Sequence, residues 1–139
     1  MKTPKLQTGI LFQQDLHLMV YRPRGILGEK DVETIVAELE HLEDAADQPF
    51  YRYTDLSKID AVDLRFEFIF RISLHRRRVY AKHPPTKSAF LVTSPATTRV
   101  ARTHAILSDH SPLRVKLFKE IEPAAKWLGV STEDLDRVS

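Results

Sequence analysis

Four short polar side chains lie close together in residues 53–63, at Asp55, Ser57, Asp60 and Asp63. This segment follows an apolar, aromatic run and precedes the longest apolar stretch of the chain. We therefore expect it to contain a strand end, a polar loop and the start of the next element. In open α/β sheets, ligands and partners bind at the carboxyl ends of strands. Carboxylates held close together shift each other's pKa, and they can divide acid and base roles or hold a metal ion.

A structural role for these side chains is the interpretation that we favour. Asp55 and Ser57 can satisfy backbone N–H groups of the loop, and Asp63 can cap a following helix. The spacing of a calcium-binding loop is absent, because no glycine or distal glutamate follows at the required positions. We therefore predict no metal site and no catalytic residue, and we keep all four side chains as candidates for binding a partner or ligand.

A fifth candidate for ligand binding is Ser94, which stands immediately before Pro95. A serine followed by proline is typical of the cap and first residue of a helix. Helix N-termini bind anions through their free N–H groups. An alternative function is therefore that of an enzyme or small-ligand carrier, with a pocket formed by the Asp55–Asp63 loop and this helix start.

The one strongly basic cluster is Arg76, Arg77 and Arg78, which follows His75 and precedes Lys82. We favour a structural interpretation, in which these cations stabilise the C-terminal end of a helix. A weaker alternative is contact with an anionic partner, a phosphate-bearing ligand, an anionic membrane or a nucleic acid. Nucleic acid is disfavoured, because the net charge is only +2 and no aromatic platform accompanies the arginines.

The residues or motifs that several other kinds of site require are absent from this sequence. The chain has no cysteine, which excludes disulfides, thiolate metal sites and a cysteine nucleophile. Its six histidines show no zinc-helix spacing, and its four glycines form no phosphate-binding loop. We therefore predict no cofactor, and we expect His104 to be a hydrogen-bonded packing residue.

The length and composition are those of one ordinary domain. The chain has 139 residues, of which 42% are hydrophobic and 29% charged. No stretch has the 18 or so consecutive apolar residues that a membrane span requires, and the start of the sequence has no signal-peptide pattern. We expect a soluble cytoplasmic protein that forms a single domain over residues 1–139.

The pattern of apolar residues predicts the order β-β-α-β-α-β-α-β-α. This order indicates an α/β sandwich with an N-terminal β-hairpin and a largely parallel sheet. The expected strands are 9–12, 16–21, 50–56, 87–92 and 113–118, and the expected helices are 28–42, 62–80, 96–107 and 122–128, with a last helical turn from Ser131.

The segment Val62–Tyr80 has two possible interpretations. Its apolar residues alternate with polar ones, which is a strand pattern, yet the stretch is long for a strand and has no internal breaker. We favour a helix, on which these residues would cover more than one face. The excess apolar surface predicts a homodimer, with Phe66, Phe70 and Leu74 at the interface.

Two stretches are similar to a known family. Tyr53-Thr54-Asp55-Leu56-Ser57 resembles the "DLS" end of the third strand in the SpoIIAA-like group, relatives of the STAS domains of bacterial anti-sigma-factor antagonists. Residues 115–129, with Ala124-Ala125-Lys126-Trp127-Leu128, resemble the C-terminal strand and helix of that group. The resemblance implies a SpoIIAA-like topology and a non-enzymatic, regulatory module that binds a protein partner or, in some relatives, a small or lipidic ligand.

The sequence departs from the family at one point. In STAS members, a serine or threonine in the loop after the third strand is phosphorylated by a partner kinase. Here residues 58–63 contain no hydroxyl, and Ser57 lies earlier, at the strand end. The resemblance therefore implies partner binding without the usual phosphorylation, and Asp60 or Asp63 would hold a constant negative charge.

Overall fold

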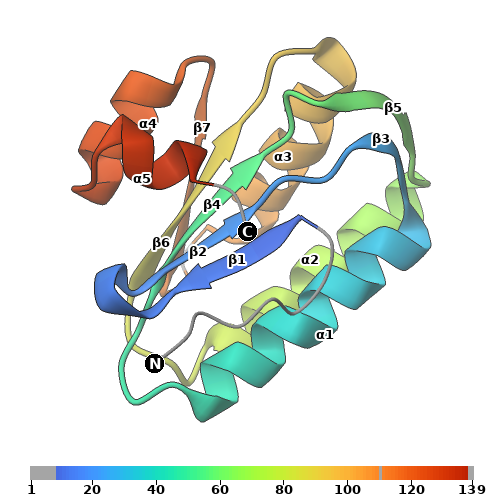
Figure 1. Ribbon diagram of the computed structural model, residues 1–139. Coiled ribbons are helices and arrows are strands. Elements are labelled where there is room, and N and C mark those ends of the chain that lie inside the picture. Colours follow the sequence, from blue (N-terminus) through green and yellow to red (C-terminus); the bar gives the residue numbers. More distant parts are fainter. Residues whose placement is uncertain (1–8, 110, 138–139) are drawn as a thin grey trace.

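A five-stranded sheet forms the centre of the computed structural model, which describes residues 9–109 and 111–137. The strand order is β1-β2-β4-β6-β7 (Figure 1). The strands are β1 (Ile10–Gln13), β2 (Leu18–Tyr21), β4 (Tyr51–Asp55), β6 (Thr86–Leu91) and β7 (Leu113–Phe118). Strands β1 and β2 pair antiparallel across the short 3-10 turn η1 (Gln14–Leu16), and the other pairs are parallel. The predicted hairpin and largely parallel sheet are confirmed.

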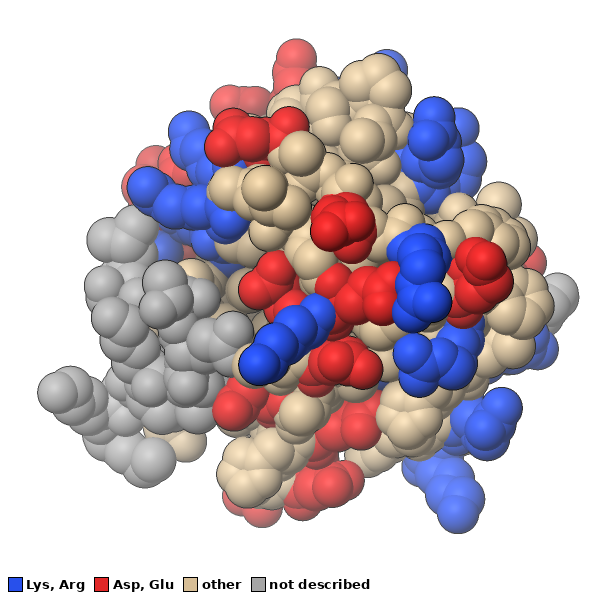
Figure 2. Space-filling model, turned by 90° about the vertical axis from the view of Figure 1, so that its right-hand side faces the viewer, with Lys and Arg blue, Asp and Glu red and all other residues tan. Residues whose placement is uncertain are grey.

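Helices cover both faces of this sheet (Figure 1). One face carries α1 (Glu29–Ala45), α2 (Phe66–Tyr80) and α3 (Pro95–Leu107). The other carries α4 (Ile121–Leu128) and α5 (Thr132–Asp136). Figure 2 shows the side of the molecule formed by α1 and α2, where acidic side chains gather across the middle and basic ones lie mainly towards the edges.

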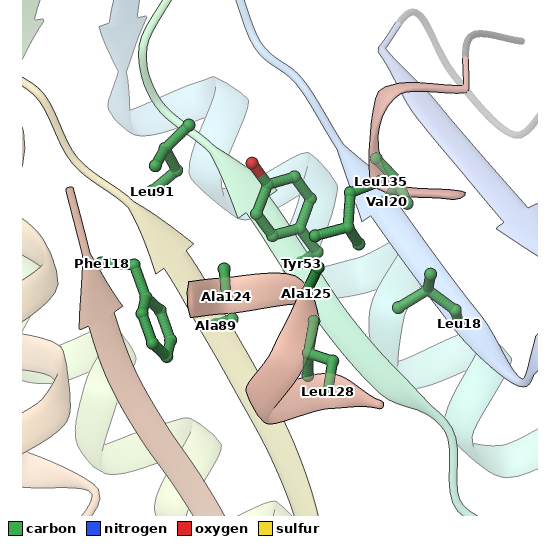
Figure 3. Packing of buried hydrophobic residues seen from close by; sticks show 10 residues of the cluster. All are labelled: Leu18, Val20, Tyr53, Ala89, Leu91, Phe118, Ala124, Ala125, Leu128 and Leu135. Atoms are coloured by element: carbon green, nitrogen blue, oxygen red, sulfur yellow. The ribbon is translucent and has the colours of Figure 1, made fainter. Parts of the chain in front are cut away.

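The apolar core is divided by the sheet because successive side chains of a strand point to opposite faces. Leu18 and Val20 of β2, with Tyr53 and Ala89, face α4 and α5 and share a cluster with Leu128 of α4 (Figure 3). The intervening residues Met19 and Tyr21 belong to a second cluster, under α1. A third cluster lies beneath α3. The alternation in sequence therefore decides which helices each strand contacts.

The ends of the later helices follow the predicted chemistry. Ser94 precedes α3, Pro95 is its first residue, and Ser131 accepts a hydrogen bond from the Asp134 N–H at the start of α5. Gly129 ends α4 with φ 74° and ψ 29°, the left-handed conformation that glycine adopts at low cost. Strand β7 is an edge strand, and its Arg114 and Lys116 are exposed.

A second, two-stranded sheet was not predicted. Strand β3 (Gly25–Gly28) pairs parallel with β5 (Ile59–Asp63), and Gly28 lies opposite Asp63. Because β5 is mostly exposed, its sequence lacks the strong apolar alternation by which strands are recognised.

The predicted start of α2 at Val62 is wrong, although the helix itself is confirmed. Arg65 occupies the N-cap position and Asp63 remains in β5, so Asp63 caps no helix. Arg65 instead fixes the start of α2 to the start of α1. Its Nε and Nη2 donate to the two carboxylate oxygens of Glu29 at 2.8 and 2.9 Å. No helix among the described residues is both long and apolar enough to cross a membrane.

Candidate partner-binding surface

The predicted acidic loop is divided between the end of one strand and the whole of another. Asp55 ends β4, and its Oδ1 accepts a hydrogen bond of 2.9 Å from the Ser57 N–H. This contact closes the turn after β4, which is the structural role that the sequence favoured. Asp60 and Asp63 are exposed residues of β5. Among the described residues, no group of three or more His, Asp or Glu side chains is placed to hold a metal ion.

Ser94 acts as a helix cap at the edge of an open groove. Its Oγ accepts a hydrogen bond of 3.2 Å from the Thr97 N–H. The groove has a volume of about 750 Å³ and carries Arg99, Arg102 and Lys119 on its walls. Ser94 lines this groove, whereas the four polar residues of the 53–63 segment do not. The predicted ligand-binding residues therefore do not converge on this groove.

The basic cluster does not form a single surface patch. Arg77 and Arg78 are exposed, but the Arg76 side chain is only 3% exposed. Arg76 lies on the inner face of α2, on the same side as Ser73 and Tyr80, because these positions are three or four residues apart. The prediction of Arg76 as a surface residue is wrong.

Arg76 instead takes part in a buried ion cluster that joins α1, α2 and the sheet. Its Nη1 and Nη2 donate to the two carboxylate oxygens of Glu43 at 3.0 and 2.6 Å. Arg52 of β4 donates to the same carboxylate at 2.7 Å. Burial alone would raise the pKa of Glu43, but the hydrogen bonds and charges of Arg76 and Arg52 outweigh it and hold that pKa below its ordinary value.

The sequence contains a signal for this buried cluster. Glu43 follows Ile35 and Leu39 at intervals of four residues, so it lies on the apolar face of α1. A carboxylate on such a face is buried only when it is paired, which points to a basic partner inside the fold.

The outer face of α2 carries two exposed aromatic side chains. Phe66 is 63% exposed and Phe70 is 41% exposed, and their ring centroids lie 6.1 Å apart. Leu74 continues the same stripe one turn further on and is half-buried. Next to it lies a hollow of about 520 Å³, lined by Phe70, Leu74, His75 and Arg78 among others. The structure thus places all three predicted interface residues on one surface.

The charges along this face lie mainly at opposite ends by sign, with Arg71, which is also exposed and lines the hollow, between them. Glu67 lies in the first turn of α2, and Asp63 stands just before the helix. Arg77 and Arg78 lie in the last turn, and all four side chains are exposed. We call this surface, from Phe66 through Phe70 and Leu74 to Arg78, the α2 face.

Comparison with known proteins identifies the fold. A solved structure of an uncharacterised DUF3478 family protein from Shewanella loihica PV-4, described as having a SpoIIAA-like fold, matches with a TM-score of 0.53. The two proteins share 18% sequence identity, and the match covers 86% of this chain and 90% of that one. No protein-family model matches the sequence, and no curated protein does. The chain therefore has a SpoIIAA-like α/β fold, as the sequence predicted.

Proposed function

We propose that this chain is a non-enzymatic binding module that works through protein contacts, and that its α2 face binds a second copy of the chain. The observation that carries the proposal is the pair of exposed rings, Phe66 and Phe70, on a helix whose opposite face is buried. Large apolar side chains that gather on one surface mark interaction sites more often than scattered ones do.

The second copy is the partner that the charge distribution favours. In a two-fold symmetric pair the same surface serves both molecules, and an axis perpendicular to α2 makes the two α2 helices run antiparallel. The acidic start of one helix, with Asp63 and Glu67, then faces the basic end of the other, with Arg77 and Arg78. Complementary charges of this kind fix the orientation of two partners.

The shape of the α2 face supports the same arrangement. Phe66 projects from one end of the helix, and the hollow beside Leu74 and His75 lies two turns further along. An antiparallel partner places its own Phe66 over this hollow. Each molecule then inserts its Phe66 ring into the hollow of the other. Burying an aromatic side chain contributes about 1.5–3 kcal/mol for each ring.

The test is the molecular mass of the purified protein in solution, measured by light scattering and sedimentation equilibrium over a range of concentrations. We expect a dimer of twice the 16.0 kDa chain, and we expect Phe70→Glu to give a monomer. The matched control is Ile106→Glu, because Ile106 is 67% exposed but lies on α3. It should remain dimeric. A wild-type monomer at high concentration, or a Phe70→Glu dimer as stable as the wild type, would overturn the proposal.

A further inference from the structure

Helix α2 lies over a cavity of about 140 Å³ between the sheet and helices α1, α2 and α3. Its lining is predominantly apolar and includes Val36 of α1, Ile69 and Ile72 of α2, Phe90 of β6 and Val100 of α3. The cavity lies on the side of the sheet opposite α4 and α5, and the α2 face belongs to the other, outer side of the helix. The cavity and the α2 face therefore lie on different sides of the helix, and Ile72 borders both the cavity and the hollow beside that face.

Apolar packing alone does not hold α2 above this cavity. Phe68 and Ile69 are its buried apolar residues, yet both line the cavity and neither belongs to the three apolar clusters of the core. Three polar contacts along its length also hold the helix. They are the Arg65–Glu29 pair, the 3.0 Å contact of Ser73 with His104, and the Arg76–Glu43 pair. Side chains that border a void lose dispersion contacts, so the site is incompletely packed.

One polar residue that lines the cavity, His104, can form a further hydrogen bond. The Nδ1 atom of His104 contacts the Ser73 hydroxyl, and its other ring nitrogen has no partner among the described residues. Burial, with a smaller effect of the Arg76 charge, lowers the pKa of His104 to about 4, so the imidazole is neutral at neutral pH. Arg76, which also lines the cavity, is already committed to Glu43 and Glu40.

We propose that this cavity binds a small uncharged molecule with a single ring, whose one polar group bonds to His104. The volume sets the size, because an apolar protein cavity of about 150 Å³ stays dry and accepts benzene. The apolar walls exclude charged ligands, since an ion buried there would lose its hydration without compensation. The unused nitrogen of His104 favours a ring with a hydroxyl over an unsubstituted ring.

Phenol and benzene are suitable probes for this proposal. Both should raise the Tm of the protein in proportion to the logarithm of their concentration, because each binds the folded state only. In amide NMR spectra, the shifted signals should belong to residues around the cavity, such as Ile72 and Val100. Phenol should bind about fivefold more tightly than benzene, which is the size of one net neutral hydrogen bond. His104→Leu should remove that preference while benzene still binds.

Filling the cavity provides the decisive variant. Val100→Phe places a ring inside it and should abolish the binding of both probes, whereas Ile106→Phe, on the exposed side of the same helix, should leave binding unchanged. If Val100→Phe does not fold, the smaller change Val36→Leu should weaken benzene binding at least tenfold. Absence of any Tm rise or localised NMR shift in the wild type, or unchanged binding in the folded filled variant, would overturn the proposal.

Discussion

Glu43 and Arg76 form two hydrogen bonds of 3.0 and 2.6 Å, although they are 33 residues apart in the chain. Arg52 joins the same carboxylate from the central sheet, and its guanidinium lies 4.5 Å from the centroid of the Phe50 ring. One buried carboxylate therefore connects α1, β4 and α2. Two buried cations share this anion, and of the two only Arg76 has a second carboxylate partner among the described residues, Glu40 at 3.2 Å, so the cluster is sensitive to the loss of Glu43.

The first prediction concerns that carboxylate. Glu43→Gln keeps the size of the side chain but leaves the buried Arg52 without its carboxylate partner and the buried Arg76 with Glu40 alone. We expect a loss of about 3–5 kcal/mol in the free energy of unfolding, measured by urea denaturation, since breaking a buried ion pair has this cost. The control Glu33→Gln changes an exposed carboxylate of α1 and should alter stability by less than about 0.5 kcal/mol. Equal effects of the two substitutions would contradict the role assigned to Glu43.

The second prediction concerns pH and His104. Its pKa is about 4 in the folded protein and 6.5 in the unfolded chain, so the unfolded state binds more protons between these values. Stability should therefore be full above pH 6.5 and fall as the pH decreases towards 4, by about 3 kcal/mol at most. His104→Gln should flatten this part of the profile, and His41→Gln, at an exposed position, should not. An unchanged slope in the His104 variant would show that another group is responsible.

The third prediction separates capping from ligand binding at Ser94. Ser94→Ala removes the hydroxyl that accepts from the Thr97 N–H and should cost about 1 kcal/mol of stability. Ser94→Gly should cost only a few tenths of a kcal/mol, because glycine is itself a tolerated N-cap. Thermal and urea unfolding of the two variants measure the difference. Equal stability of the alanine and wild-type proteins would mean that the cap contributes little.

The fourth prediction tests the orientation of the proposed dimer. Arg78→Glu places a negative charge opposite the acidic start of the partner's α2 helix, so it should weaken association at least tenfold. Adding Glu67→Arg to the same chain exchanges the two signs and should recover much of the affinity, as measured by sedimentation equilibrium. Failure of the second change to recover any affinity would exclude the antiparallel arrangement. Added salt should reduce all of these differences.

The main sheet and helices α1 to α4 could be predicted because their signals are local. The alternation of apolar residues indicates the strand Leu113–Phe118, Ser94-Pro95 indicates a helix start, and Gly129 suits a helix end. Each signal lies within the element that it specifies or next to it. The β3–β5 sheet could not be found in this way. Its strands are short, and β5 is held by pairing with Gly25–Gly28, a segment that the sequence marks only as a break.

Part of the candidate surface could be predicted, because its signal is also local. Phe66, Phe70 and Leu74 share one side of a helix, and their spacing alone shows this. Arg76 looked like a member of an exposed basic run because its neighbours Arg77 and Arg78 are arginines. Its burial depends on Glu43, whose position beside α2 is a property of the tertiary fold.

The cavity beneath α2 also has a volumetric consequence. Unfolding eliminates internal voids, so the unfolded chain occupies less volume than the folded protein and hydrostatic pressure favours it. The elements around the void, α2 above all, should lose their structure at lower pressure than the packed layer of α4 and α5 on the opposite face of the sheet. The two faces of this fold therefore differ in compressibility as well as in packing.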